Sequence, residues 1–214
     1  MAAGVTIVDY GMGNLLSVRR AFEHCRAEVN VATDATAVYD AERLVLPGVG
    51  AFADGMHEIR QSGLYDALRE YSTLNRPMLG ICLGMQMLFS CSEEFGDHQG
   101  LGIIPGQVVK IPVVGTDGLP HKIPHVGWSG LLRPEEVGGW NGTILEGLPS
   151  GADVYLVHSY AAVPARSADR LAYCHYDGQV ITAAVRSGAV YGCQFHPEKS
   201  GPVGLQILNR FARL

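Results

Sequence analysis

Short apolar runs alternate with amphipathic segments through the first half of the chain. A pattern typical of buried strands, short and rich in β-branched residues, recurs at residues 5–10, 29–32, 43–46 and 77–82. Residues 15–25 repeat apolar side chains at helical spacing, and residues 52–62 and 64–74 form two further predicted helices separated by Gly63. Alternating strands and helices predict a mostly parallel sheet with helices on both faces.

From residue 107 onward, predicted strands predominate. They lie at residues 108–111, 153–160, 170–176, 179–186 and 189–195. Asp177-Gly178 and Ser187-Gly188 are turn sequences between the last three, which predicts an antiparallel meander. Residues 203–214 carry apolar side chains on one helical face. We therefore expect an α/β fold, an open and mostly parallel sheet flanked by helices, with an added antiparallel β meander.

Composition and charge narrow the class of protein. The 214 residues are 47% hydrophobic and 17% charged, which is typical of one globular domain spanning residues 1–214. The net charge of −5 argues against nucleic acid or an anionic membrane as a partner. The five cysteines lack the spacing of a zinc site or a disulfide framework, which favours a cytoplasmic location. We find neither a signal-peptide pattern nor the ~20 consecutive apolar residues of a membrane span.

The most informative stretch is residues 77–89, where a cysteine interrupts an apolar run. Gly80 and Gly84 lie two positions before and two after Cys82, the spacing of a Gly-x-Ser-x-Gly nucleophile elbow with sulfur in place of oxygen. We interpret the stretch as a buried strand, a sharp turn at Cys82 and a helix that offers backbone N–H groups. Because lone cysteines in apolar segments commonly serve packing, this stretch alone leaves catalysis and packing equally open.

A polar cluster, His196-Pro197-Glu198, follows the last predicted strand. In an extended chain residues i and i+2 point the same way, so Glu198 would hold the His196 imidazole while its other nitrogen faces Cys82. Both segments follow strands, and the carboxyl ends of strands form sites in α/β sheets. The set provides a nucleophile, a base and an orienting acid. Taken alone, the tripeptide also fits a polar turn after an edge strand.

Two glycine-containing loops follow predicted strands. Gly11 and Gly13 suggest dinucleotide binding, but Leu16 stands where the third glycine of that fingerprint belongs, so we reject this interpretation. The sequence Pro-Gly-Val-Gly at residues 47–50 gives a backbone whose peptides reorient at low cost. The simpler interpretation of this second loop is a plain strand-to-helix turn.

Together, these motifs resemble class I (triad) glutamine amidotransferases. The similarity is carried by Gly-Ile-Cys-Leu-Gly-Met-Gln at residues 80–86 and by the His-Pro-Glu sequence at residues 196–198. More narrowly, the chain resembles the glutaminase subunits of imidazole glycerol phosphate synthase at residues 9–15, 46–52, 100–106, 124–128 and 157–160. Leu-Gly-Met-Gln in place of Leu-Gly-His-Gln favours that narrower resemblance, which spans the whole chain.

The resemblance implies a glutaminase that converts L-glutamine to glutamate through a thioester on Cys82, with His196 as proton shuttle and Glu198 as its orienting partner. Oxyanion donors would be the backbone N–H of Leu83 and a backbone N–H of the second loop, at Val49 or Gly50. The implied substrate-pocket residues are Gly48, Gln86, His158, Ser159 and Tyr160. No cofactor and no metal are expected.

The resemblance also implies a partner, a separate cyclase subunit with a (β/α)8 barrel. This subunit would use the ammonia to form imidazole glycerol phosphate and aminoimidazole carboxamide ribotide in histidine biosynthesis. Asn14, Arg19 and Trp128 are expected at the docking interface, and Ser129 stands where this family has asparagine. Two alternatives stay open: the glutaminase of another triad amidotransferase, and a noncatalytic docking or regulatory subunit.

Overall fold

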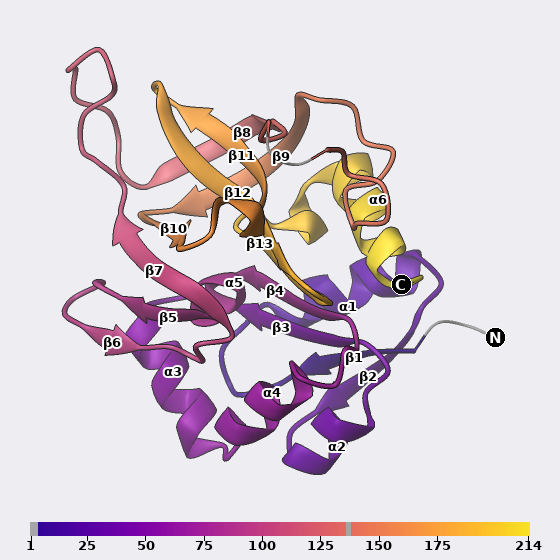
Figure 1. Ribbon diagram of the computed structural model, residues 1–214. Coiled ribbons are helices and arrows are strands. Elements are labelled where there is room, and N and C mark those ends of the chain that lie inside the picture. The colour runs from indigo at the N-terminus through magenta and orange to yellow at the C-terminus, as the bar shows by residue number, and fades with distance from the viewer. Residues whose placement is uncertain (1–3, 136–137) are drawn as a thin grey trace.

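The computed structural model describes residues 4–135 and 138–214. In this part of the chain the main sheet has seven strands in the order β11-β12-β13-β4-β3-β1-β2 (Figure 1). Neighbouring strands are parallel from β13 to β2, and this part comprises β1 (Gly4–Val8), β2 (Glu28–Ala32), β3 (Leu44–Gly48), β4 (Met78–Cys82) and β13 (Val190–Cys193). The antiparallel meander is completed by β11 (Arg170–Tyr176) and β12 (Gln179–Ser187), as predicted.

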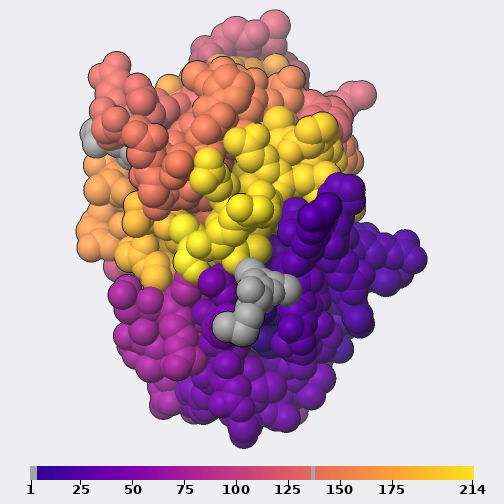
Figure 2. All heavy atoms as spheres, turned by 90° about the vertical axis from the view of Figure 1, so that its right-hand side faces the viewer, coloured from indigo at the N-terminus to yellow at the C-terminus, as the bar shows by residue number. Residues whose placement is uncertain are grey.

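Helices cover both faces of this sheet (Figure 1). They are α1 (Leu15–His24), α2 (Ala35–Asp40), α3 (Phe52–Gln61), α4 (Tyr65–Tyr71), α5 (Leu83–Met87) and α6 (Gly201–Phe211). Alternate side chains of β4 enter different cores: Leu79 and Ile81 join Phe22 and Phe211, whereas Met78 joins the core beneath α3 and α4. Figure 2 shows the yellow C-terminal helix packed against the indigo N-terminal segment. None of the described helices is long and apolar enough to cross a membrane.

Two smaller sheets lie beside the main one. The first contains β10 (Tyr160–Pro164), β7 (Ile104–Lys110), β5 (Phe89–Ser92) and β6 (His98–Gln99), and the second pairs β8 (His125–Leu131) with β9 (Ala152–His158). The strand predicted at residues 153–160 is confirmed as far as His158, but its predicted end is wrong, because the chain changes sheets at Ser159. The helix predicted after Cys82 is shorter than expected, because Phe89 already pairs with Ile104 in β5.

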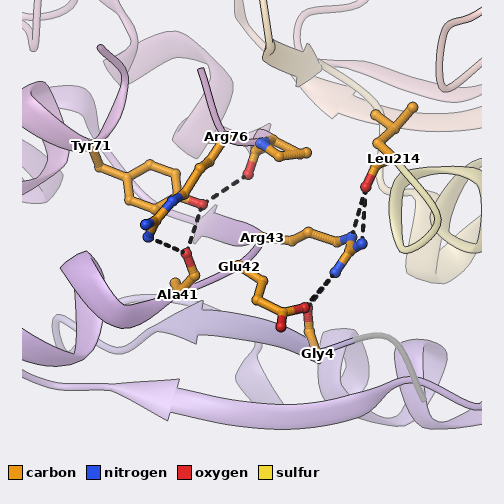
Figure 3. Close-up of polar contacts among 8 residues, drawn as sticks. Gly4, Ala41, Glu42, Arg43, Tyr71, Arg76 and Leu214 are labelled. Atoms are coloured by element: carbon orange, nitrogen blue, oxygen red, sulfur yellow. Dashed lines mark hydrogen bonds and ion pairs between the residues drawn. The ribbon is translucent and has the colours of Figure 1, made fainter. Parts of the chain in front are cut away.

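Polar contacts close the amino ends of the parallel strands, the edge opposite their carboxyl ends (Figure 3). The Arg43 guanidinium donates to the backbone oxygen of Gly4 at 3.3 Å and to that of Leu214 at 2.9 Å, and it lies 3.0 Å from the Glu42 carboxylate. One side chain thus joins the start of β1 to the end of α6. The C-terminal segment is held at this edge, away from the carboxyl ends of the strands.

We expect Tyr71→Phe to lower the free energy of unfolding by about 1 kcal/mol. The buried Tyr71 hydroxyl lies 3.3 Å from the carbonyl oxygens of both Ala41 and Pro77, and burial raises the pKa of Tyr71 to about 12, so the hydroxyl stays a donor (Figure 3). Phenylalanine keeps the packing but removes this donor. Denaturant titration measures the loss. The control Tyr65→Phe, which removes a longer 3.4 Å contact to Gly100, should cost less than about 0.5 kcal/mol, and equal losses would contradict our account.

Candidate active site

A cavity of about 310 Å³ opens at the carboxyl ends of β3 and β4. It is lined by Val49, Gly50, Cys82, Leu83, Gln86, Glu94, Pro124, Val157, His158, Ser159, Tyr160 and His196. The sequence predicted all of these as site residues except Glu94, Pro124 and Val157. A volume at the lower end of the range for ligand pockets suits a small molecule.

Cys82 occupies a strained turn between β4 and α5. Its φ of 55° and ψ of −111° lie in a region that non-glycine residues rarely adopt, and strain of this kind gathers at functional sites. The flanking glycines permit the turn: a Cβ at Gly80 would lie 2.7 Å from the Met85 backbone, and one at Gly84 would overlap the Leu46 carbonyl. The predicted elbow is therefore confirmed. The first N–H groups of α5, beginning at Leu83, have no acceptor within the helix.

His196 and Glu198 form a buried pair next to this turn. β13 runs parallel to β4, so the segment that follows β13 ends beside Cys82. His196 Nδ1 lies 2.8 Å from Glu198 Oε1, and the two side chains are 4% and 1% exposed. Burial alone would lower the pKa of His196, but hydrogen bonds to Cys82 and Glu198 and the charges of both outweigh it and raise the pKa to about 9. At neutral pH His196 is therefore an imidazolium between the sulfur and the carboxylate.

A hydrogen bond from a buried tyrosine holds the first residue of the segment at residues 47–50 in place. The Tyr10 hydroxyl donates to the Pro47 carbonyl at 2.9 Å, and burial together with the Cys82 charge raises the pKa of Tyr10, so it stays a donor. Gly48, predicted as a substrate-pocket residue, does not line the cavity; a Cβ there would come within 2.8 Å of the Tyr10 oxygen and of the Gly84 backbone nitrogen. Beyond this anchor Val49 is exposed and Gly50 has a φ of 99°. The backbone is therefore held at Pro47, whereas the glycine-containing backbone that follows it can change conformation more easily.

A chain of hydrogen bonds fixes the Tyr160 carbonyl at the opposite wall. Burial lowers the pKa of His158 to about 4, so the ring is neutral, and its Nδ1–H must donate to the Tyr160 oxygen at 2.8 Å. Its Nε2 then accepts from His125 Nδ1 at 3.1 Å, and His125 Nε2 accepts from the Ser129 hydroxyl at 3.1 Å. The hydroxyl of Ser129 thus begins a directional chain that ends at the cavity.

Gln86 lines the cavity from the Cys82 face of α5, as predicted, but its nitrogen is already engaged. Gln86 Nε2 donates to the Tyr160 carbonyl at 3.0 Å and to Gln194 Oε1 at 3.1 Å. Only the amide oxygen of Gln86 is left for a ligand. Helical spacing predicted that Gln86 faces the cavity, but it could not reveal that the nitrogen is engaged. The two acceptors, on Tyr160 and Gln194, lie 74 and 108 residues away in the sequence.

Glu94 gives the cavity a carboxylate that sequence reasoning missed. Its Oε2 accepts from the backbone N–H of Phe52, the first residue of α3, at 2.7 Å. The residue follows β5, a strand whose sequence resembles the end of a helix. An acidic pair after an apolar run was the signal available, and acidic side chains in proteins are mostly surface residues.

The predicted docking residues do not line the cavity. Asn14 Oδ1 accepts from Ser17 N at 3.3 Å and caps α1. Arg19 forms an exposed pair with Glu23 at 2.7 Å, which explains its side-chain position without a partner. Trp128 lies on β8 and is 57% exposed. Their place in an interface stays a prediction.

Sequence comparison identifies close relatives over nearly the whole chain. The model of the family described as glutamine amidotransferase class-I matches residues 6–213. Imidazole glycerol phosphate synthase subunit HisH 1 of Legionella pneumophila (strain Lens) is 49% identical and the alignment covers 99% of this chain and 100% of that protein. The HisH subunit of Syntrophotalea carbinolica is 46% identical, with coverage of 97% and 98%.

Solved structures agree on the fold. A putative GMP synthase protein from Thermoplasma acidophilum superimposes with a TM-score of 0.69 at 19% identity, covering 100% of this chain and 94% of that one. PurLQS from Thermotoga maritima gives 0.71 at 17% identity, covering 100% and 99%. At such identities the likeness concerns the fold alone, and it confirms the predicted α/β architecture. The chain belongs to the class-I glutamine amidotransferases and, within them, to the family of HisH subunits of imidazole glycerol phosphate synthase.

Proposed function

We propose that this chain is the glutaminase subunit of an imidazole glycerol phosphate synthase, a single amidotransferase domain over residues 1–214 that acts in the cytoplasm. The observation that carries the proposal is the strained Cys82 beside the buried His196–Glu198 pair. The 49% identity to a HisH subunit supports the choice of glutamine as substrate and of histidine biosynthesis as pathway.

In the proposed reaction the Cys82 thiolate attacks the side-chain amide carbon of glutamine. The imidazolium of His196 gives its proton to the amide nitrogen, the C–N bond breaks, and ammonia leaves behind a glutamyl thioester. Neutral His196 then takes a proton from water, whose oxygen attacks the thioester, and the C–S bond breaks to release glutamate. Glu198 keeps the imidazole oriented and stabilises its charged form through the 2.8 Å contact.

The negative charge that develops on the amide oxygen needs donors. Leu83, the first residue of α5, supplies one backbone N–H, and Val49 or Gly50 supplies the second. The second donor requires a peptide of the adaptable segment to turn toward the cavity, and Gly50, at φ 99°, accommodates such a turn. We propose that docking of the partner stabilises this turned conformation.

The polar lining suits the charged end of glutamine. Glu94 contributes a carboxylate and Gln86 an amide oxygen, and both accept hydrogen bonds, as an α-ammonium group requires. The backbone around Ser159 and Tyr160 completes the wall, and His158 holds the Tyr160 carbonyl in place by a hydrogen bond. A glutamine held at these groups by its charged end would direct its side-chain amide toward Cys82.

The proposed partner is a cyclase subunit with a (β/α)8 barrel, which docks near Asn14, Arg19 and Trp128 and receives the ammonia. The exposed indole of Trp128 is an aromatic anchor of the kind enriched in interfaces. The proposed partners do not include a nucleic acid or a membrane.

We expect the cyclase subunit, loaded with its ribotide ligand, to raise the rate of glutamate release about 10²- to 10³-fold, because one oxyanion donor is worth that much. Steady-state assays of the isolated chain and of the mixture measure the ratio. Equal turnover in both would contradict the partner-dependent step. Stimulation by a different synthase instead would assign the chain to another triad amidotransferase, and no turnover with any partner would leave a docking subunit.

A further inference from the structure

Gln194 lies between Cys82 and the opposite wall, and the proposed reaction makes no use of it. It follows the last residue of β13, its side chain is 0% exposed, and its backbone N–H donates to Ala183 at 2.9 Å. Gln194 Nε2 lies 3.9 Å from Cys82 Sγ, and Oε1 lies 3.1 Å from Gln86 Nε2. The residue does not line the cavity, so it reaches the reaction only through the sulfur.

The neighbours dictate which end of the Gln194 amide faces Cys82. The Tyr160 carbonyl can only accept, so the group of Gln86 that contacts it at 3.0 Å must be the NH₂. That NH₂ also faces Gln194, which must present oxygen to it at 3.1 Å. The nitrogen of Gln194 is therefore directed at the sulfur. The reverse orientation would place two NH₂ groups against each other in a dry interior.

This arrangement surrounds the sulfur with two donors. The imidazolium of His196 approaches it from the segment after β13, and the Gln194 N–H reaches it from the neighbouring position two residues earlier. A donor that points at a sulfur in a water-poor site favours the charged thiolate over the neutral thiol. The distance of 3.9 Å suits a large, diffuse acceptor.

We propose that Gln194 is a positioning residue for Cys82: its side-chain N–H, aimed by Gln86 and the Tyr160 carbonyl, holds the sulfur in its thiolate form and in line with the cavity. The inference rests on the proposed function, since it assigns Cys82 as the nucleophile. If Gln194 had only a structural role, it would do no more than accept the hydrogen bond from Gln86. Its loss would then affect folding but not the pH dependence of Cys82 alkylation.

The test is the pH dependence of Cys82 alkylation by iodoacetamide, followed by mass spectrometry of the peptide that contains it. In Gln194→Leu we expect the pH of half-maximal alkylation rate to rise by about one unit, which is about a tenfold slower reaction at pH values below both midpoints. The kcat for glutamine, measured with the cyclase subunit, falls while KM stays the same, because Gln194 does not line the cavity.

Two further variants keep the test decisive. Gln194→Glu preserves size and should fold, and its carboxylate beside the sulfur shifts the alkylation profile further in the same direction. Thr182→Val removes another buried polar group, one that binds Arg170 on β11, and should leave the profile unchanged. A wild-type profile in both Gln194 variants would overturn the proposal. If the wild-type complex releases no glutamate, the proposed function fails instead, and alkylation still reports on Gln194.

Discussion

Replacing Cys82 with alanine should lower glutamine-dependent turnover by about 10⁴-fold or more when the cyclase subunit is present. The thioester route needs the sulfur, and water has no comparable activation in the cavity. The effect is largest for the nucleophile because the proton transfers of His196, which Glu198 orients, serve steps in which the Cys82 sulfur forms and breaks its bond to the substrate. Glutamate release by the complex measures the loss.

The same variant should retain synthesis from added ammonia, because ammonia enters the reaction after the step that Cys82 performs. Cys91→Ala is the matched control: it removes another free cysteine, on β5, and should leave both activities unchanged. A glutamine analogue that alkylates thiols should label the wild-type complex at Cys82. Persistent glutamine turnover in Cys82→Ala would contradict the proposed nucleophile, and loss of the ammonia-dependent activity as well would indicate failed docking.

The order of strands and helices could be predicted because each carries its own local signal. Val5 and Ile7 alternate with the side chains that face the other core, and α6 repeats Ile207, Leu208 and Phe211 on one face. The elements that sequence reasoning missed have weaker signals. β8 contains two glycines and an exposed tryptophan, and its register is set by pairing with β9. Such strands depend on tertiary contacts more than on local preference.

The candidate site divides in the same way. Cys82, His196 and Glu198 stand in short segments whose spacing already implies their geometry. Gln194 was within reach of the same argument, since residues i and i+2 share a side and it precedes His196 by two positions. Tyr10 was out of reach, because its role depends on a hydrogen bond to a residue 37 positions away. Long-range contacts complete the site and leave no local pattern.

The second large effect is expected for Glu198→Gln, which keeps the size of the side chain and removes its charge. We expect glutamine turnover to fall by about 10³- to 10⁴-fold, as in other triads whose orienting carboxylate becomes an amide. Glu198 Oε2 is buried and, among the described residues, has no hydrogen-bond partner. The carboxylate charge therefore acts mainly on His196, and an amide that turns its NH₂ toward Nδ1 would also favour the wrong tautomer.

The charge change predicts a shift in the pH profile. The His196 pKa of about 9 lies above the ordinary value of 6.5, so the imidazolium persists at neutral pH and is lost only as the pH rises through about 9. Without the Glu198 charge and hydrogen bond, two of the four interactions that raise the pKa of His196 are gone, and this pKa falls. The basic limb of kcat/KM, near pH 9 in the wild type, should move to lower pH in Glu198→Gln.

Rates of glutamate release by the complex between about pH 6 and pH 10 test this, with ammonia-dependent synthesis as the internal control for folding and docking. Glu146→Gln is the matched variant: it removes a carboxylate that pairs with Arg210 at 3.5 Å on the surface, and it should keep the wild-type rate and basic limb. A Glu198→Gln enzyme with reduced rate but an unmoved basic limb would show that the carboxylate only orients the ring. A near-normal rate would remove Glu198 from the proposed triad altogether.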